Sequence, residues 1–459
     1  MLIRHTMASS FDPDGEIVKS GVPNIREKIG RRRFMKGAGT ATVAASMGLA
    51  GCSNPAQQGG GSTGGGEIPS EPLRMACIGF TSGPASVFGT PMMQSARMVV
   101  DRINQEGGIL GEREIEMEEF DENVDEVVQQ YRRLATQEDF DVIVGYISSA
   151  NILSVAPIAE ELGQPTVVWD TGTTDLFDKA NKDPQYVFRT CASSSTDAVG
   201  AARLLQNALP DVQTVAGVNQ DYAFGRNNWD LFSQAVESLG IDVELVESRF
   251  TPFPNDDYSS TISALNDINP DFIYSSHWGG DAVNFITQAN NQGLFDDTIP
   301  CFTAGSHVIG NIPDEIPEGI LFGARGPHYP FGDQQWNTLH EEFVKNYQNE
   351  YNEPPYAHGA FHAWQAIWAY VYSIERAYNL SGQYPTKDQW VKSMEGIGFN
   401  SPSGFVNMPQ GSHNVVEPSF YGFSEQRDGR VALRDTVWIT PEYVNPPASM
   451  TTSEWIDSF

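Results

Sequence analysis

From residue 73 onward, short apolar runs alternate with stretches whose apolar side chains recur at helical spacing. In residues 92–105, for example, Ala96, Val99 and Ile103 fall on one face of a helix. The first series of strands and helices is 73–80, 92–105, 114–120, a helix around Tyr131, 142–144, 152–162 and 165–169. Strands that alternate with helices through short, glycine-bearing links predict βαβ units and a parallel, doubly wound sheet.

A second series of the same kind begins near Ser195. It comprises helices at 198–208, 229–239, 262–268 and 282–292, and strands at 212–218, 243–250, 272–275 and 298–302. The chain closes with helices at 334–351, at 358–378 and around Trp390, and with a hairpin of strands 420–423 and 431–438. Asp428-Gly429 is a hairpin turn signal. The pattern therefore predicts an α/β fold of two doubly wound parallel-sheet lobes.

A composite export signal precedes the patterned part of the chain. Arg31-Arg32, followed by Phe34, resembles the twin-arginine motif, and a short apolar segment leads to residues 49–52 (LAGC), which resemble a lipobox. That segment is too short to remain as a membrane-spanning helix. We interpret residues 1–51 as a twin-arginine lipoprotein signal with an N-terminal extension, and Cys52 as the lipid-bearing residue. Residues 52–70, rich in Gly, Ser and Gln, are expected to form a flexible tether.

The excess of acidic over basic residues excludes some classes of binding partner. The chain carries 28 Lys and Arg against 59 Asp and Glu, and the part after residue 51 carries 20 against 55, a formal charge of −35. Such a surface repels nucleic acid and anionic lipid head groups. The acids are spread through patterned segments and aromatic residues make up 11% of the chain, which disorder does not predict. The composition resembles that of haloarchaeal proteins, whose self-repulsion is screened by salt.

The loops that follow the predicted strands carry the candidate chemistry, because ligands of open parallel sheets bind at the carboxyl ends of the strands. These loops are 81–89, 145–150 and 170–174 in the first lobe and 219–225, 276–281 and 303–307 in the second. The first set is rich in hydroxyl groups and the second in aromatic rings. Hydroxyls beside free backbone N–H groups suit a carboxylate or another oxygen acceptor, and aromatic rings supply an apolar wall. We therefore expect a small solute with one polar end.

Signals for metal or enzymatic chemistry are weaker. His358 and His362 stand at i, i+4 on a predicted helix, but Gly359 occupies the position where a hydrolytic zinc helix has Glu, and Trp364 and Trp368 favour a packing face. No Gly-x-Ser-x-Gly elbow, P-loop or dinucleotide fingerprint occurs. The three remaining cysteines sit in apolar runs and are expected to be buried thiols: Cys77, Cys191 and Cys301. We predict no metal site, no cofactor and no catalytic activity.

Five segments occur in an order that is known from one family. They are 78–84 (IGFTSGP), 101–111 (DRINQEGGILG), 145–150 (GYISSA), 187–190 (VFRT) and 221–225 (DYAFG). In this they resemble the type I periplasmic binding proteins, and most of all the leucine/isoleucine/valine-binding and amide-binding branch, which delivers ligands to ABC transporters. The resemblance implies a three-crossover hinge that closes on ligand. It implies lobe I at 71–189 and 326–397, lobe II at 190–325 and 398–445, and a C-terminal tail at 446–459.

The resemblance also implies which residues meet the ligand. Together with the loop hydroxyls, the expected ligand-binding set is Ser82, Phe88, Ser148, Ser149, Thr173, Thr174, Tyr222, Phe224, His277, Trp278 and Ser306. Amino-acid binders of this branch hold the ligand's ammonium group with a glutamate, and the matching residues here are 304–307 (AGSH). Asp170, Asp221 and Asp281 are candidates to replace that glutamate. Its absence also favours an uncharged ligand, such as an amide or urea derivative.

We interpret the protein as the extracytoplasmic substrate-binding protein of an ABC importer. It is expected to be a monomer, anchored only through lipid on Cys52 to the outer face of the cytoplasmic membrane, and to hand a small polar solute to an integral membrane permease. Branched-chain or other amino acids and amide- or urea-like compounds are the solutes expected. A ligand sensor of the same fold that acts on a membrane receptor is the alternative. A secreted hydrolase is disfavoured, because the loops offer no nucleophile–base–orienter set.

The lipobox interpretation predicts that Cys52→Ser abolishes lipid attachment while leaving the fold intact. Cell fractionation should then find the variant in the medium, with the circular dichroism spectrum of the wild type. If the variant stays with the membranes through repeated high-salt washes, the protein is held there by something other than a lipid on Cys52.

The acidic composition predicts that stability rises with salt. The Debye length falls from about 30 Å at 0.01 M to about 3 Å at 1 M salt, so repulsion among the surface carboxylates weakens steeply over this range. Melting temperatures measured from low to molar potassium chloride should increase throughout. A melting temperature that is independent of salt would contradict the halophilic interpretation.

Overall fold

The computed structural model describes residues 66–323, 325–326, 328–329, 337–427 and 429–459. The predicted export signal, Cys52, most of the predicted tether and Asp428 of the predicted hairpin turn lie outside these residues. The chain divides into two units, Met1–Gly60 and Gly61–Phe459, and everything described below belongs to the second. Gly66 exchanges two backbone hydrogen bonds with Tyr384, of 3.3 and 2.8 Å. The last residues of the expected tether are therefore joined to the fold.

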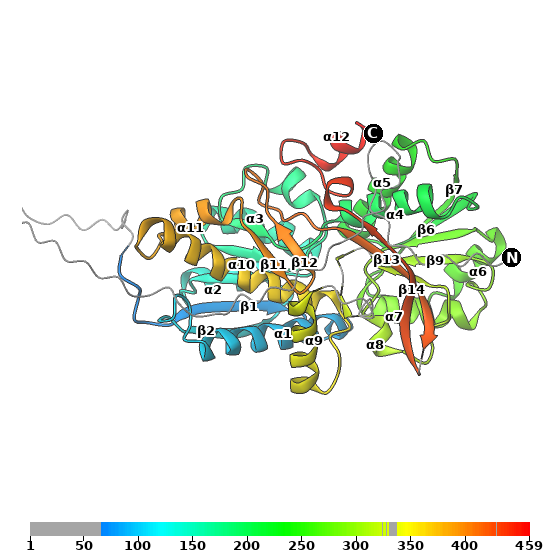
Figure 1. The fold of residues 1–459 in the computed structure, drawn as a ribbon. Coiled ribbons are helices and arrows are strands. Elements are labelled where there is room, and N and C mark those ends of the chain that lie inside the picture. The colour runs from blue at the N-terminus through cyan, green and yellow to red at the C-terminus, as the bar shows by residue number, and fades with distance from the viewer. Residues whose placement is uncertain (1–65, 324, 327, 330–336, 428) are drawn as a thin grey trace, which may run out of the picture. The chain divides into compact units, whose positions relative to one another are not determined.

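Five parallel strands form the first sheet, in the order β2-β1-β3-β4-β5 (Figure 1). The strands are β1 (Leu73–Gly79), β2 (Ile115–Asp121), β3 (Val142–Gly145), β4 (Thr166–Val168) and β5 (Val187–Arg189). One face packs against α1 (Ser86–Gln105), α10 (His358–Ser381) and α11 (Lys387–Met394), and the other against α2 (Val127–Thr136) and α3 (Ser149–Leu162). We call this assembly the first lobe.

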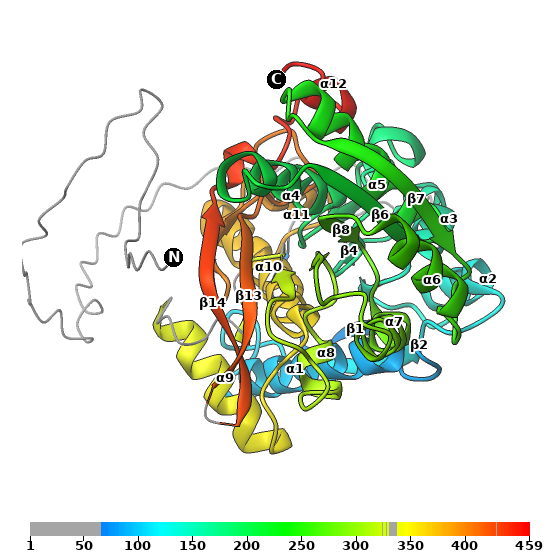
Figure 2. The ribbon, with the colours of Figure 1, turned by 90° about the vertical axis from the view of Figure 1, so that its right-hand side faces the viewer.

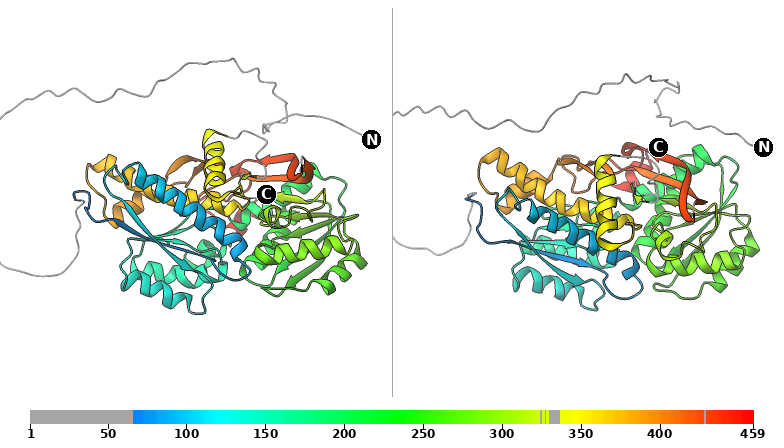
Figure 3. Two further views of the ribbon diagram at one scale, coloured as in Figure 1. Left: turned by 90° about the horizontal axis from the view of Figure 1, so that it is seen from below. Right: turned by 60° about the horizontal axis from the view of Figure 1, so that its bottom comes forward.

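Side chains alternate across the first sheet, as the pleat of a strand requires. Met75 and Cys77 of β1 enter the core beneath α1 and α10, whereas Ala76 and Ile78 enter the core beneath α2 and α3. Figure 3 shows α1 and α10 side by side, and the Ser95 hydroxyl of α1 donates to the Ala360 carbonyl of α10 at 2.6 Å. Burial on both faces explains why β1 is apolar from Met75 to Ile78.

Seven strands form the second sheet, in the order β14-β13-β10-β9-β8-β6-β7. They are β6 (Thr214–Gln220), β7 (Glu244–Thr251), β8 (Phe272–Ser275), β9 (Ile299–Phe302), β10 (Leu321–Gly323), β13 (Ser419–Arg427) and β14 (Arg430–Ile439). The first five run parallel, and β13 and β14 form the antiparallel pair that Figure 2 shows at the edge. Helices α4 (Ser194–Ala208) and α5 (Ala223–Ser238) cover one face, and α6 (Ser259–Ile268), α7 (Gly279–Asn291) and α8 (Val308–Asn311) the other. This assembly is the second lobe.

The prediction of doubly wound α/β lobes is confirmed: the described residues form two largely parallel sheets, each with helices on both faces. The remaining elements are short or lie beside the lobes. They are a π-helix η1 (Leu176–Ala180), α9 (Thr338–Tyr351), a two-stranded sheet of β11 (Gly398–Ser401) and β12 (Gly404–Asn407), a 3-10 helix η3 (Pro441–Tyr443) and α12 (Thr452–Ile456).

Packing changes lobe at points that differ in part from those expected. Phe399, Val406 and Val415, which the expected boundaries place in lobe II, belong to the hydrophobic core that contains α1, α10 and α11. The expected C-terminal tail also packs, because Trp455 and Ile456 of α12 join the core between α4, α5 and the second sheet. Apolar side chains in a short segment show that it is buried, but they do not show against which lobe.

A buried carboxylate fixes the turn between β3 and α3. Glu122 accepts the backbone N–H groups of Ile147 and Ser148, one on each oxygen, at 2.8 Å, and the Asn151 amide at 3.2 Å. The Ser148 hydroxyl caps α3 by accepting the Asn151 N–H. Burial raises the pKa of Glu122 to about 7, although these hydrogen bonds favour the ionised form. The N-terminus of α3, a natural anion site, is thus filled by a carboxylate of the protein itself.

Glu122→Gln should change how stability depends on pH. Because the folded pKa of Glu122 lies above its ordinary value of 4.5, its ionisation stabilises the unfolded chain more than the folded one. Relative to the variant, the wild type should lose about 3 kcal/mol of unfolding free energy as the pH rises from below 4.5 to above 7. Denaturant unfolding at constant molar salt measures this, with the exposed Glu112→Gln as control. A difference between wild type and variant that is the same at every pH would contradict the shift.

Candidate functional site

A small cavity lies where loops of the two lobes meet. Its lining is Phe88, Ile147, Asp170, Gly172, Tyr222, Phe224, Trp278, Ala304, Arg325 and His358. The cavity volume is about 20 Å³, which is enough for about one water molecule. The carboxyl ends of β1, β3, β4, β6, β8 and β9 lead into the lining loops, as expected for open parallel sheets. The remaining two residues come from α10 and from the segment after β10.

Aromatic rings form one wall of the cavity. The ring centroids of Phe88 and Trp278 are 6.0 Å apart in an edge arrangement, so a ring of the first lobe contacts one of the second. The Trp278 indole N–H donates to the Tyr222 hydroxyl at 2.7 Å, and Tyr222 stacks on Phe253 at 5.1 Å. These contacts hold the wall in place without a ligand. Four residues of the predicted set, Phe88, Tyr222, Phe224 and Trp278, therefore line one cavity.

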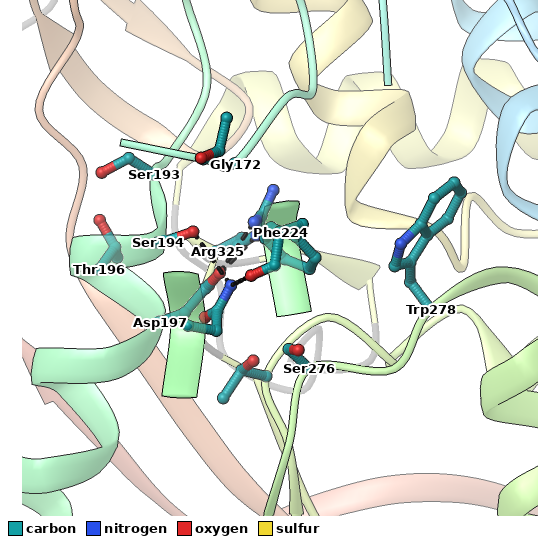
Figure 4. A network of polar contacts seen from close by, with 12 residues as sticks. Gly172, Ser193, Ser194, Thr196, Asp197, Phe224, Ser276, Trp278 and Arg325 are labelled. Carbon is teal, nitrogen blue, oxygen red and sulfur yellow. Dashed lines mark hydrogen bonds and ion pairs between the residues drawn. The ribbon is translucent and has the colours of Figure 1, made fainter. Parts of the chain in front are cut away.

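Arg325 forms the centre of a charged wall that adjoins the aromatic one. Its guanidinium donates to both carboxylate oxygens of Asp197, at 3.1 and 2.8 Å, and to Asp170 at 3.0 Å, and all three side chains are buried. Figure 4 shows Arg325 beside the Phe224 ring, with Asp197 reaching the guanidinium from α4; the guanidinium carbon is 5.1 Å from the ring centroid. Burial alone would lower the pKa of Arg325, but Asp197 and Asp170 more than offset this and raise it. Arg325 therefore stays charged.

Two histidines of α10 continue the charged wall. His362 lies between Asp170 and Glu417, with its Nδ1 3.2 Å from Asp170 Oδ1 and its Nε2 3.4 Å from Glu417 Oε2. Burial lowers the pKa of His362, but the two carboxylates outweigh burial and raise it to about 9. His358 Nε2 is 3.7 Å from Asp170 Oδ2, and burial, with the charges of His362 and Arg325, lowers the pKa of His358 well below its usual value. His362 is thus the protonated imidazole and His358 the neutral one.

The predicted hydroxyl groups do not line the cavity. Ser148 caps α3, and its backbone N–H is taken by Glu122. Thr173 and Thr174 lie within 3.5 Å of the Asn227 side chain of α5, which satisfies them across the lobes. Ser149 is buried elsewhere, and Ser82 is exposed and accepts from Asn123 at 3.0 Å. The expected carboxylate site on these hydroxyls is therefore not formed in this structure: Glu122 and Asn227 occupy the donors of Ser148, Thr173 and Thr174, and the Ser149 hydroxyl is buried without a hydrogen-bond partner.

Two further predicted residues lie behind the cavity wall. His277 is buried in the core of the second lobe, where its ring contacts the hydroxyls of Thr251 and Ser275 at 3.0 and 2.9 Å. The hydroxyl of Ser306 lies 3.3 Å from Nδ1 of His358 and so orients a residue of the lining. Neither His277 nor Ser306 itself lines the cavity.

Of the three candidate ammonium partners, Asp170 alone belongs to the lining. Asp221 forms an ion pair with Arg226 at 2.6 Å and is largely exposed. Asp281 accepts from the Tyr258 hydroxyl at 3.1 Å, and burial raises its pKa to about 6. Both are therefore engaged away from the cavity.

Sequence reasoning missed Arg325 as a lining residue and Glu122 as the partner of the loop before α3, and it favoured packing for His358. Arg325 directly follows the buried strand β10, and a charged residue at the carboxyl end of such a strand is a usable signal. Gly172 carries another: a Cβ on it would overlap the Arg325 guanidinium and the Phe224 ring. No comparable pattern marks Glu122, whose partners lie 25 and 26 residues further on.

Within the described residues, no helix has the length and apolar character needed to cross a bilayer.

Comparison with known proteins identifies the family. A family model described as "Periplasmic binding protein" matches residues 72–425. Among curated proteins, Leu/Ile/Val-binding protein homolog 7 of Brucella abortus is 22% identical over 295 residues, which cover 62% of this chain and 72% of the relative.

Solved structures share the fold. A solute-binding protein of an ABC transporter from R. palustris, in complex with 4-hydroxybenzoate, has a TM-score of 0.69 at 20% identity and covers 81% of this chain and 98% of its own. A leucine-binding protein from Thermotoga maritima has a TM-score of 0.66 at 21% identity, with coverage of 81% and 99%. With its two doubly wound lobes and a cavity among their loops, the chain belongs to the periplasmic binding protein family.

Proposed function

We propose that the protein is the extracytoplasmic substrate-binding protein of an ABC importer and captures a small polar organic solute in the cavity. The observation that carries this proposal is the origin of the lining. Phe88 and Asp170 come from the first lobe, Phe224 and Trp278 from the second, and Arg325 from a segment that joins them. A solute in contact with all of these residues stabilises the arrangement in which the lobes are together.

The two walls favour a solute with an oxygen-rich head and a modest apolar part. Arg325 has N–H groups beyond the three that bond Asp197 and Asp170, and these suit a carboxylate, amide or urea oxygen. The rings of Phe88, Phe224 and Trp278 suit the apolar part. Amino acids, including branched-chain ones, and amide- or urea-like compounds fit this description. The aromatic acid and the amino acid named for the R. palustris and Thermotoga proteins also carry a carboxylate head.

Entry of such a solute requires the lobes to separate, because the cavity holds about one water molecule. The segments that absorb this motion are those that change lobe, after β5, after β10 and before β13. Closure on the solute then produces the form that an integral membrane permease recognises. Binding and release without turnover is all that this role needs.

Thermal shift at molar salt tests the solute class. Leucine, valine, benzoate, short amides, urea and an acidic amino acid form the panel, and a solute present at about 100 times its dissociation constant adds about 2.7 kcal/mol of stability. At least one member with a carboxylate, amide or urea head should raise the melting temperature. If only sugars or polyols do so, the proposed class is wrong.

A matched pair of tryptophan variants tests whether the solute binds in the cavity. Trp278→Phe removes part of the aromatic wall and the indole hydrogen bond to Tyr222, and should weaken binding about tenfold. Trp390→Phe alters a buried tryptophan of the first-lobe core that is not in the lining, and should leave the dissociation constant unchanged. Equal losses in both variants would place the binding site elsewhere.

A further inference from the structure

We propose that Asp170, His358 and His362 form a binding site for a divalent transition-metal ion of the class of Zn²⁺, Co²⁺ and Ni²⁺, at the edge of the cavity. The two-histidine spacing on its own favours packing, because a third ligand is missing from the sequence pattern. The fold supplies that ligand from 188 residues earlier in the chain than His358, since Asp170 follows β4 and α10 packs over the same sheet.

The distances suit one small ion. The three residues each offer one ligand atom, and these atoms lie within 4.8 Å of one another. Asp170 Oδ1 is 3.2 Å from His362 Nδ1, and Asp170 Oδ2 is 3.7 Å from His358 Nε2. Tetrahedral Zn²⁺, with bonds of about 2.0–2.2 Å, places its ligand atoms roughly 3.2–3.6 Å apart. The two separations from Asp170 are close to this range, whereas the widest separation, which reaches 4.8 Å at most, requires the side chains to move together.

Both histidines already have the outer partner that a metal ligand uses. A coordinating imidazole directs its second nitrogen to a carboxylate, a carbonyl or another oxygen, which fixes the tautomer. Nε2 of His362 lies 3.4 Å from Glu417 Oε2, and Nδ1 of His358 lies 3.3 Å from the Ser306 hydroxyl. The ligand atoms would be the two nitrogens that face Asp170, and His362, which is protonated without the ion, would release a proton when the ion binds.

Unsatisfied polar atoms gather at this point. Asp170 Oδ2, both ring nitrogens of His362 and Glu417 Oε2 are buried without a hydrogen-bond partner. Such atoms are costly unless an ion or a water satisfies them. Gly359, between the two histidines, keeps the approach short, because a Cβ there would lie 2.7 Å from Asp170 Oδ2.

The nearby charges accept a divalent cation. Arg325 opposes it, with its guanidinium 3.0 Å from Asp170 Oδ1. The buried guanidinium of Arg189 also opposes it. However, Asp170, Asp197 and Glu417 are three buried carboxylates, so negative charge stays in excess once His362 has released its proton. Paired nitrogen ligands exclude Mg²⁺ and Ca²⁺, which prefer all-oxygen sites, and select a first-row transition ion.

A site with three protein ligands leaves one coordination position for a water or solute oxygen. Asp170 and His358 line the cavity, so that position faces the space where the solute is proposed to bind. On the basis of the proposed function, the ion would hold the oxygen-rich head of the solute beside Arg325. Asp170 then serves the metal and not an ammonium group.

Cobalt titration of the full chain tests the site. The protein is produced without a histidine tag, stripped with EDTA, desalted into molar potassium chloride and titrated with Co²⁺ while visible absorption is recorded. One equivalent should produce the intense visible bands of a tetrahedral Co²⁺ site, and Zn²⁺ should displace it. Asp170→Asn, His358→Gln and His362→Gln should each abolish the bands. Glu417→Gln should weaken binding about 10- to 100-fold.

His340→Gln is the matched control, because His340 is a buried histidine on α9 whose Nδ1 lies 3.0 Å from the Pro402 carbonyl. Its bands should equal those of the wild type, and circular dichroism identifies which ligand variants are folded. Absence of the bands in the wild type, or wild-type bands in any folded ligand variant, overturns the metal site.

The solute panel is run on the metal-free and on the metal-loaded protein. Solute binding to both forms alongside a failed cobalt titration would refute the metal and leave the proposed function standing.

Discussion

Arg325 connects the charges of the two lobes, and the arrangement of the cavity depends on it. Asp170 follows a strand of the first sheet, Asp197 lies in a helix on the second, and the guanidinium between them is 3% exposed. Removing one partner of a buried ion pair costs about 3–5 kcal/mol, because the other charge is left without compensation. The lobes therefore meet through a polar contact that holds one geometry, while the Phe88–Trp278 contact adds apolar area beside it. A solute that bonds Arg325 joins this network and need not displace it.

Hydrogen bonds within the protein also explain why few polar groups remain free in the cavity. Side chains of the protein satisfy the donors that a ligand would otherwise use: Glu122 takes the N–H groups before α3, and Asn227 takes Thr173 and Thr174. Each is a hydrogen bond that would be costly to leave unmade in a buried turn. What remains open to the cavity is a guanidinium, a carboxylate and an imidazole on one side and rings on the other. Selectivity for a solute therefore rests on few contacts, most of them charged.

How much of the structure can be predicted from the sequence depends on how far apart along the chain the interacting residues are. The alternation of short apolar runs with helical spacing predicted both sheets, because strands that are buried on both faces, such as β1 and β3, are mostly apolar. Phe88, Tyr222, Phe224 and Trp278 were predicted from the loops at the strand ends together with the family resemblance, and they do line one cavity. The hydroxyl residues satisfied the same rule but do not line the cavity, because their partners, Glu122 for Ser148 and Asn227 for Thr173 and Thr174, lie 26 to 54 residues away. The contact of Arg325 with Asp170 spans 155 residues and has no local signature.

Two glycines show that the charged wall is set by the backbone as much as by its side chains. A Cβ on Gly172 would overlap Arg325 and Phe224, and one on Gly359 would press on Asp170 and on the Met92 sulfur. The loop after β4 and the first turn of α10 must therefore approach more closely than any other residue type allows. That closeness brings Asp170 within 3.7 Å of His358 and lets one carboxylate meet a guanidinium and two imidazoles at once. The histidine pair, which on its own helix favours packing, becomes part of a charged site because Gly359, between the two histidines, has no side chain to hold Asp170 away.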